Sequence, residues 1–174
     1  MNRLLGCFII TIFSNCVTAQ KTIVSDKLSY KLPKSAESIS ATSRLKPDKP
    51  DKYSIIQTNN KSGTAFQIDD ISFLVHSSEG TLLKNFLPDL RKSLNYDKQM
   101  SSSTYKIQEI TKLNNFSYLL YTYKFSTSNK EYLMLFAVDD SYTKVLSAVA
   151  EYDEHDSTKA EKIVNDFIKS IKFK

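Results

Sequence analysis

Apolar and polar residues alternate with a period of two through the middle of the chain, between residues 116 and 152. Three runs there predict strands. The last, 143–152, carries the small residues Ser147, Ala148 and Ala150, as expected where a helix lies close on a sheet. The first two, 116–125 and 131–138, carry apolar residues on both of their alternating faces. Strands with this pattern are covered on both sides. Short polar runs rich in Ser, Asn and Asp separate the three, as is typical of tight turns. The pattern predicts an antiparallel meander at the centre of the fold.

A helical period replaces this alternation in two places. Residues 157–173 carry an apolar stripe formed by Ala160, Ile163, Val164, Phe167 and Ile171. Residues 81–94 carry a second stripe, formed by Leu82, Leu83, Phe86, Leu90 and Leu94. Within it, Pro88 predicts a kink or a restart, and residues 95–97 predict the end. Both stripes predict helices that pack on the sheet, with Asp156 or Ser157 as the N-cap of the later one.

Shorter strands precede the meander. Residues 28–32 alternate and end at Pro33, whereas residues 53–58 and 64–68 predict a hairpin. The alternation slips by one position at Asp69–Asp70, which predicts a bulge, a bend or a tight turn. The remaining predictions are a loop or short helical turn at 35–43, an exposed proline-punctuated loop at 44–52 and a strand at 105–113. The predicted fold is a single α+β domain, with an antiparallel sheet of about six strands packed by two main helices.

Residues 1–19 have the features of a secretory signal peptide. Arg3 supplies the positive charge, and the apolar run 4–13 is too short to span a bilayer. Small residues before Gln20 predict that the mature chain comprises residues 20–174, located in the periplasm or secreted, with no integral membrane span. An uncleaved anchor and a lipidated cysteine are the alternatives.

The mature chain offers little chemistry for catalysis. Both cysteines lie in the predicted signal peptide, so no thiolate nucleophile, disulfide or cysteine metal ligand is left. His76 and His155 are far apart in sequence and are predicted to be solvated surface residues. Gly63 and Gly80 are too few for a phosphate-binding loop. We predict no catalytic residue, no cofactor and no enzymatic activity.

Acidic residues cluster before the last helix, at Glu151, Asp153, Glu154 and Asp156. Hard cations bind several convergent oxygens. The spacing fits no calcium loop, however, and turn formation and helix capping explain the same residues, so we predict no metal site.

The distribution of charge argues against a nucleic-acid partner. The chain carries a formal charge of +5, and removal of Arg3 with the signal peptide leaves +4. Lysines interleave with acidic residues, whereas nucleic-acid binding requires a concentrated basic face. We therefore expect no nucleic-acid partner.

Aromatic residues suggest a binding surface. The chain has ten tyrosines and ten phenylalanines but no tryptophan. Tyr118, Tyr121, Tyr123 and Tyr132 cluster in the predicted meander. Tyrosine is common in strands but is also favoured at recognition surfaces, where it adds contact area and a polar tip. We predict that these four residues bind a protein partner.

The order of the elements, the run Leu28-Ser-Tyr-Lys-Leu-Pro33 and the ending Ser170-Ile-Lys-Phe173 resemble the PsbP-like superfamily. The resemblance covers most of the mature chain, but its motifs are short and carry over no functional residue. It implies an α/β/α sandwich and a role in binding or assembly rather than catalysis. The Ala19-Gln20 cut and the C-terminus are similar to those of exported proteins of Bacteroidetes-like bacteria.

The leading functional hypothesis is an exported non-enzymatic binding or accessory protein, for example an immunity or assembly factor. The alternatives are a small-ligand-binding protein or hydrolase with a site spread over loops, and a metal-dependent envelope protein.

Overall fold

The computed structural model describes residues 20–39, 63–126 and 128–174, whose strands form two antiparallel sheets. The three-stranded sheet has the order β1-β2-β11, and the eight-stranded sheet has the order β3-β4-β5-β10-β9-β8-β6, with β7 also paired to β8. The strands are β1 (Gln20–Val24), β2 (Leu28–Pro33), β3 (Glu37–Ile39), β4 (Thr64–Ile68), β5 (Ile71–Glu79), β6 (Thr104–Ile107), β7 (Thr111–Leu113), β8 (Phe116–Lys124), β9 (Lys130–Asp139), β10 (Lys144–Asp153) and β11 (Lys172–Phe173). The prediction of about six strands was therefore too low, although the α+β class and the antiparallel sheet are confirmed.

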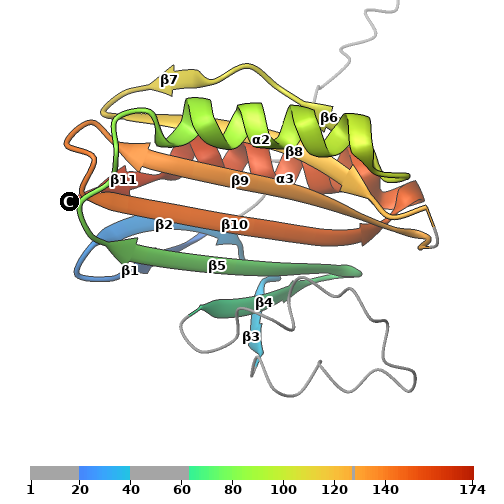
Figure 1. Ribbon diagram of the computed structural model, residues 1–174. Helices are drawn as coiled ribbons and strands as arrows, with labels where there is room; N and C mark the ends of the chain where they lie inside the picture. The colour runs from blue at the N-terminus through green and yellow to red at the C-terminus, as the bar shows by residue number, and fades with distance from the viewer. Residues whose placement is uncertain (1–19, 40–62, 127) are drawn as a thin grey trace, which may run out of the picture.

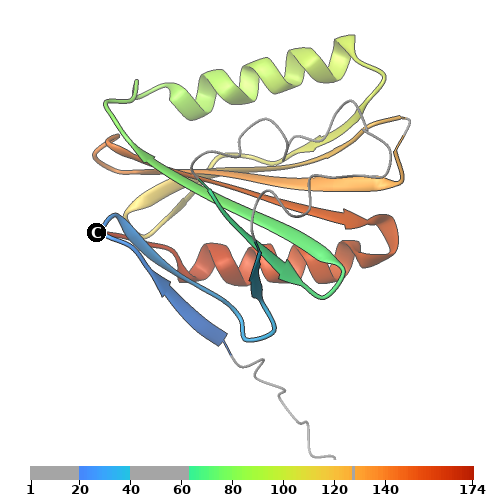
Figure 2. The same cartoon turned by 90° about the horizontal axis from the view of Figure 1, so that it is seen from below.

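Helices cover both faces of the large sheet. Helix α2 (Phe86–Met100) lies on one face, and α3 (Ser157–Ser170) lies on the other beside the small sheet (Figures 1 and 2). A short 3-10 helix, η1 (Glu154–Asp156), leads into α3. Within the described ranges, neither helix is both long and apolar enough to cross a bilayer.

The predicted meander is present as β8, β9 and β10, with bounds that differ by at most one residue. Both of its faces are buried, because one packs under α3 and the other under α2. Asn114 and Asp69 take positive φ values of 53° at two-residue turns, a conformation that Asn and Asp tolerate better than most residues. The slip predicted at Asp69–Asp70 is therefore a tight turn between β4 and β5.

Helix α2 departs from its predicted position. Residues 81–85 are not helical, because Gly80 N and Leu82 N donate to the Thr143 and Tyr142 carbonyls at 2.9 Å and hold this segment against the β9–β10 turn. Pro88 then falls in the first turn, where its missing N–H costs no helical bond, so no kink is needed. Leu83, predicted in the apolar stripe, is exposed. The helix also continues past the predicted end at 95–97 to Met100.

Helix α3 buries the predicted stripe but ends earlier than predicted. Ile171 is extended, with φ −63° and ψ 132°, so that β11 pairs with β2. This turn packs the Phe173 ring on Phe116, with centroids 5.6 Å apart. Asp156 is the N-cap, but its side chain accepts no capping hydrogen bond, contrary to the prediction.

Two other strand predictions need correction. The strand predicted at 105–113 is divided into β6 and β7, because one extra residue between Ile107 and Thr111 shifts the register against β8. Residues 37–39 form β3 rather than a loop or helical turn. The predicted signal peptide, the strand at 53–58 and the loop at 44–52 lie outside the described residues.

Candidate functional site

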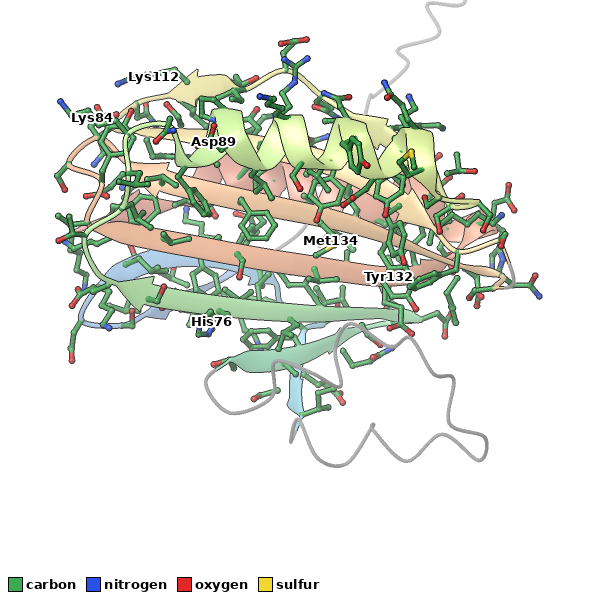
Figure 3. All side chains as sticks on the ribbon, in the orientation of Figure 1. His76, Lys84, Asp89, Lys112, Tyr132 and Met134 are labelled. Atoms are coloured by element: carbon green, nitrogen blue, oxygen red, sulfur yellow. The ribbon has the colours of Figure 1, made fainter. Side chains whose placement is uncertain are left out.

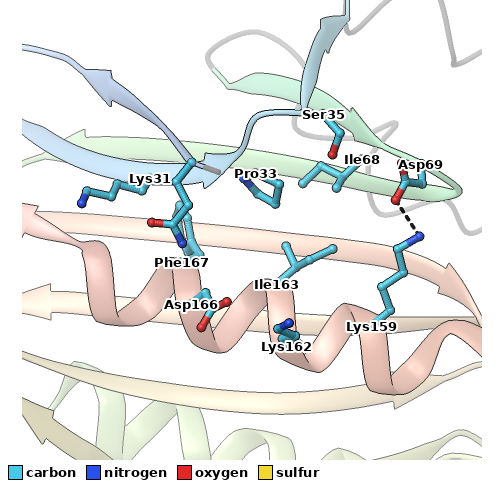
Figure 4. A pocket seen from close by; sticks show the side chains of 11 residues that line it. Lys31, Pro33, Ser35, Ile68, Asp69, Lys159, Lys162, Ile163, Asp166 and Phe167 are labelled. Carbon is cyan, nitrogen blue, oxygen red and sulfur yellow. Dashed lines mark ion pairs between the residues drawn. The ribbon is translucent and has the colours of Figure 1, made fainter. Parts of the chain in front are cut away.

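A cleft of about 190 Å³ lies where the end of β2, the β4–β5 turn and helix α3 meet (Figure 4). Its apolar lining residues are Pro33, Ile68, Ile163 and Phe167, and its polar ones are Gln20, Lys31, Ser35, Asp69, Lys159, Lys162 and Asp166. Three segments that are distant in sequence therefore contribute to one concave site.

Local structure explains how the cleft forms. Strand β2 ends at Pro33, whose carbonyl accepts from Ala36 N at 3.0 Å, and this turn leads the chain away from the small sheet. The tight β4–β5 turn presents Asp69 on the opposite side. Helix α3 completes the cleft with residues spaced i, i+3, i+4, i+7 and i+8 from Lys159, which fall along one side of a helix.

The floor of the cleft belongs to the main core. Phe167 is 1% exposed, and its ring packs edge-on against Tyr30 and Phe73, with centroid distances of 5.0 and 5.1 Å. Ile68 is equally buried, whereas Ile163 keeps some exposure. Such packing fixes the floor, so the shape of the cleft is preformed.

The rim of the cleft is charged. Lys159 Nζ lies 2.6 Å from Asp69 Oδ2, so this ion pair links α3 to the β4–β5 turn (Figure 4). The hydrogen bond from Lys159 to Asp69 raises the pKa of the lysine. Both side chains are about half exposed, and pairs of this kind stabilise a fold by less than about 1 kcal/mol. The pair can therefore open at little cost if a ligand requires it.

The four predicted binding tyrosines do not share one surface. Tyr121, Tyr123 and Tyr132 are buried in the cluster between α2 and the sheet, where Met134 also lies (Figure 3). Tyr118 is half-buried on the opposite face and packs against the core under α3. A partner would reach the first three only if α2 moved, and their binding role remains a prediction.

Burial raises the pKa values of tyrosines under α2. Desolvation raises the pKa of Tyr123 to about 12 and also raises the pKa of Tyr121. Hydrogen bonds with Ser101 and Ser103 lower the pKa values of Tyr105 and Tyr123 in part. The serine run after α2 thus ties this helix to the aromatic cluster. The raised pKa values keep the phenols of Tyr105, Tyr121 and Tyr123 neutral at physiological pH, so these residues act as packing groups.

The histidines occupy different environments. His155 is exposed in η1, with Nε2 3.3 Å from Asp156 Oδ2, as expected of a surface residue. His76 lies within β5, opposite Ser147 of β10, and is half-buried rather than fully solvated as predicted (Figure 3).

The acidic cluster does not converge on a cation. Asp153 pairs with Lys130 at 2.9 Å, and Glu154 pairs with Lys124 at 2.7 Å. In the part of the chain that the structure describes, no three His, Cys, Asp or Glu side chains are grouped so that they could hold a metal ion. Lysines thus pair with two of the four carboxylates of this cluster.

Among known proteins, similar structures are found, but no similar sequence family or curated protein. No family model and no curated protein matches the chain. Its structure is similar to that of the cyanobacterial PsbP protein CyanoP from Synechocystis, with a TM-score of 0.57 at 10% identity over 98% of this chain and 99% of that one. The chain has a PsbP-like fold.

Other solved structures are less similar to this PsbP-like chain. A protein from Bacteroides thetaiotaomicron aligns with a TM-score of 0.49 at 10% identity, over 84% of this chain and 45% of that one. The Ran-binding protein Mog1p of Saccharomyces cerevisiae aligns with a TM-score of 0.49 at 9% identity, over 89% of this chain and 95% of that one. At these identities the similarity concerns the fold alone.

The PsbP-like resemblance seen in the sequence is thus confirmed for the fold, whereas the cleft was missed. The only sequence signal for the cleft was that Lys159, Lys162 and Asp166 border the apolar stripe of α3. Nothing local indicates that Pro33 and Asp69 face them, because that juxtaposition depends on the path of the small sheet.

Proposed function

We propose that this PsbP-like chain is an exported, non-enzymatic binding protein that acts through a protein partner, with the cleft over α3 as its docking site. In this account residues 1–19 are a cleaved signal peptide, and residues 20–174 form one α+β domain in the periplasm or outside the cell. An immunity or assembly factor is the kind of protein that such a role describes.

The size and lining of the cleft carry the proposal. Pockets for small molecules and cofactors usually enclose about 300–1,000 Å³, whereas this cleft holds about 190 Å³. It is therefore too small for most cofactors but sufficient for one apolar side chain. Anchor side chains of this kind, buried in a pocket with a polar rim, contribute much of the binding energy in protein complexes. The apolar floor and charged rim fit that role.

A variant that fills the cleft tests the proposal. Ser35 is exposed at the rim, so Ser35→Tyr places a ring over the cleft without disturbing the core. Ser38→Tyr, at an exposed position outside the cleft, is the matched control. We expect that tagged wild type and Ser38→Tyr retain one stoichiometric protein from the host envelope fraction, identified by mass spectrometry. The Ser35→Tyr variant should lose it.

Two results would overturn this proposal. If a folded, exported chain retains no protein, the alternative of a small-ligand-binding protein or hydrolase is favoured. If Ser35→Tyr retains the partner as well as wild type does, binding occurs elsewhere, and the buried tyrosines under α2 become the next candidate surface.

A further inference from the structure

The outer edge of β1 presents unpaired backbone groups in the part of the chain that the structure describes. Ser25 N donates to the Leu28 carbonyl at 2.9 Å, so these two residues form a hydrogen-bonded pair at the end of the β1–β2 ladder. Hydrogen-bonded and non-hydrogen-bonded pairs alternate in antiparallel ladders. The N–H and C=O groups of Ile23 therefore point to β2, whereas those of Thr22 and Val24 point away from it.

This edge lacks the features that usually protect exposed strands. Proteins shorten edge strands, interrupt them with bulges or guard them with proline or outward lysines. Among the described strands, the edges β3 and β11 have only three and two residues, and the β6–β7 edge is interrupted. Strand β1 pairs continuously over five residues and contains no proline, and its Lys21 ammonium turns inward to the Ala36 carbonyl. It is the described edge best suited to accept another strand.

The free edge of β1 and the cleft are adjacent. Gln20, the first residue of β1, also lines the cleft. When a peptide adds a strand to a sheet edge, backbone hydrogen bonds supply affinity and a nearby pocket for a side chain supplies specificity. The edge and the cleft together provide both elements.

We propose that the protein partner binds as an added strand along the outer edge of β1 and places one apolar side chain in the cleft. This inference rests on the proposed function and specifies the chemistry of the partner. The partner supplies an extended segment whose backbone groups are free to pair, with one aliphatic residue of about the size of Val or Leu. A second copy of this chain is the competing occupant of the edge.

A pair of substitutions at Thr22 isolates the backbone contribution. Proline is tolerated in an edge strand where the lost N–H faces outward, so Thr22→Pro should fold while it removes one outward donor. Thr22→Val keeps that N–H and serves as the control. The melting temperatures of both variants should remain close to that of wild type, which confirms that the β1–β2 ladder is intact.

Peptides selected from a phage-displayed random library on the immobilised full-length chain serve as the probe. We expect the selected peptides to share one aliphatic residue and to bind wild type and Thr22→Val equally. Thr22→Pro should weaken them about tenfold, the equivalent of one lost hydrogen bond. By NMR, the Thr22 and Val24 amides should exchange quickly in the free protein and slowly with the peptide bound.

The other outcomes separate this inference from the proposed function. Peptides that bind Thr22→Pro normally but not Ser35→Tyr would leave the cleft as a docking site and overturn strand addition. A library that yields no binding peptide would overturn the inference as well. A dimer seen by sedimentation in wild type and lost in Thr22→Pro would assign the edge to a second copy and overturn the hetero-partner proposal.

Discussion

At the scale of single residues, Asp139 is the polar side chain whose role the structure defines most clearly. It is buried at the β9–β10 turn, and its Oδ1 accepts from Thr143 N and Lys144 N, each at 2.8 Å. Oδ2 accepts from the hydroxyls of Ser141 and Thr143. The carboxylate thereby holds together a turn in which Tyr142 has a φ of 57°. The sequence indicated a turn here but not which aspartate organises it.

Substitution of this residue should make stability depend on pH. Burial raises the pKa of Asp139, but hydrogen bonds from Ser141, Lys144 and Thr143 outweigh it and leave the pKa below that of an ordinary aspartate. The stabilisation is thus complete above about pH 4 and is lost as the pH falls through the lower folded-state pKa. We expect Asp139→Asn to cost about 1–3 kcal/mol at neutral pH and progressively less in acid.

Urea denaturation across the acid range measures this effect. Asp140→Asn is the control, because Asp140 is exposed and its side chain pairs with Lys112 at the surface. A constant difference between Asp139→Asn and wild type from neutral to strongly acidic pH would contradict the assigned role.

Phe167 is the residue that both the sequence and the structure place at the centre of the core. Its ring contacts Tyr30 and Phe73 and forms part of the cleft floor. Phe167→Asp would bury an unpaired charge, so we expect a loss of more than about 4 kcal/mol in the free energy of unfolding. Phe167→Leu, which keeps an apolar side chain, should cost far less. Thermal melts of both variants test this, and an aspartate variant that melts like wild type would show that α3 is misplaced.

At the scale of elements, the two helices differ in how firmly they are packed. Five residues of α3 are buried (Ala160, Ile163, Val164, Phe167 and Ile168), whereas α2 buries only Leu87 and Leu94. Both stripes were visible in the sequence, but only α3 buries its stripe in full. The start of α2 was predicted wrongly because it depends on hydrogen bonds to the β9–β10 turn. That turn lies far along the chain, so the local sequence does not reveal it.

This difference should appear in hydrogen exchange. Local opening is easiest where few apolar contacts hold an element. We expect amides in the central turns of α2 to exchange at least about tenfold faster than those of α3. Mass spectrometry of exchanged peptides measures both helices in one sample, and the central strand β10 provides an internal reference. Equal protection of α2 and α3 would contradict the packing described here.

The strands show which features a linear sequence can reveal. The meander was predicted to within one residue because its period-two pattern and turn residues are local. The pairing of Lys172–Phe173 with Leu28–Ser29 could not be predicted, since the two segments lie far apart in the sequence. The sequence keeps a helical pattern up to residue 173, so it does not indicate that the helix ends before Ile171.

At the scale of the whole molecule, the proposed docking site depends on how the two sheets meet. The small sheet and α3 share one face of the large sheet, and the cleft opens between them. The PsbP-like architecture was foreseen from the order of elements. The cleft was not, because its floor residues look like ordinary core positions and its rim residues like ordinary surface charges. Site prediction from the sequence selected tyrosines instead, three of which are buried.

Site-specific photocrosslinking in the native host tests whether a partner binds at the cleft. A photoreactive residue at position 162 lies on the rim of the cleft, whereas one at position 96 lies on the exposed side of α2. We expect position 162 to crosslink to one protein in the cell envelope and position 96 not to do so. A crosslink from position 96 alone, or none from position 162 in a folded exported chain, would contradict partner binding at the cleft.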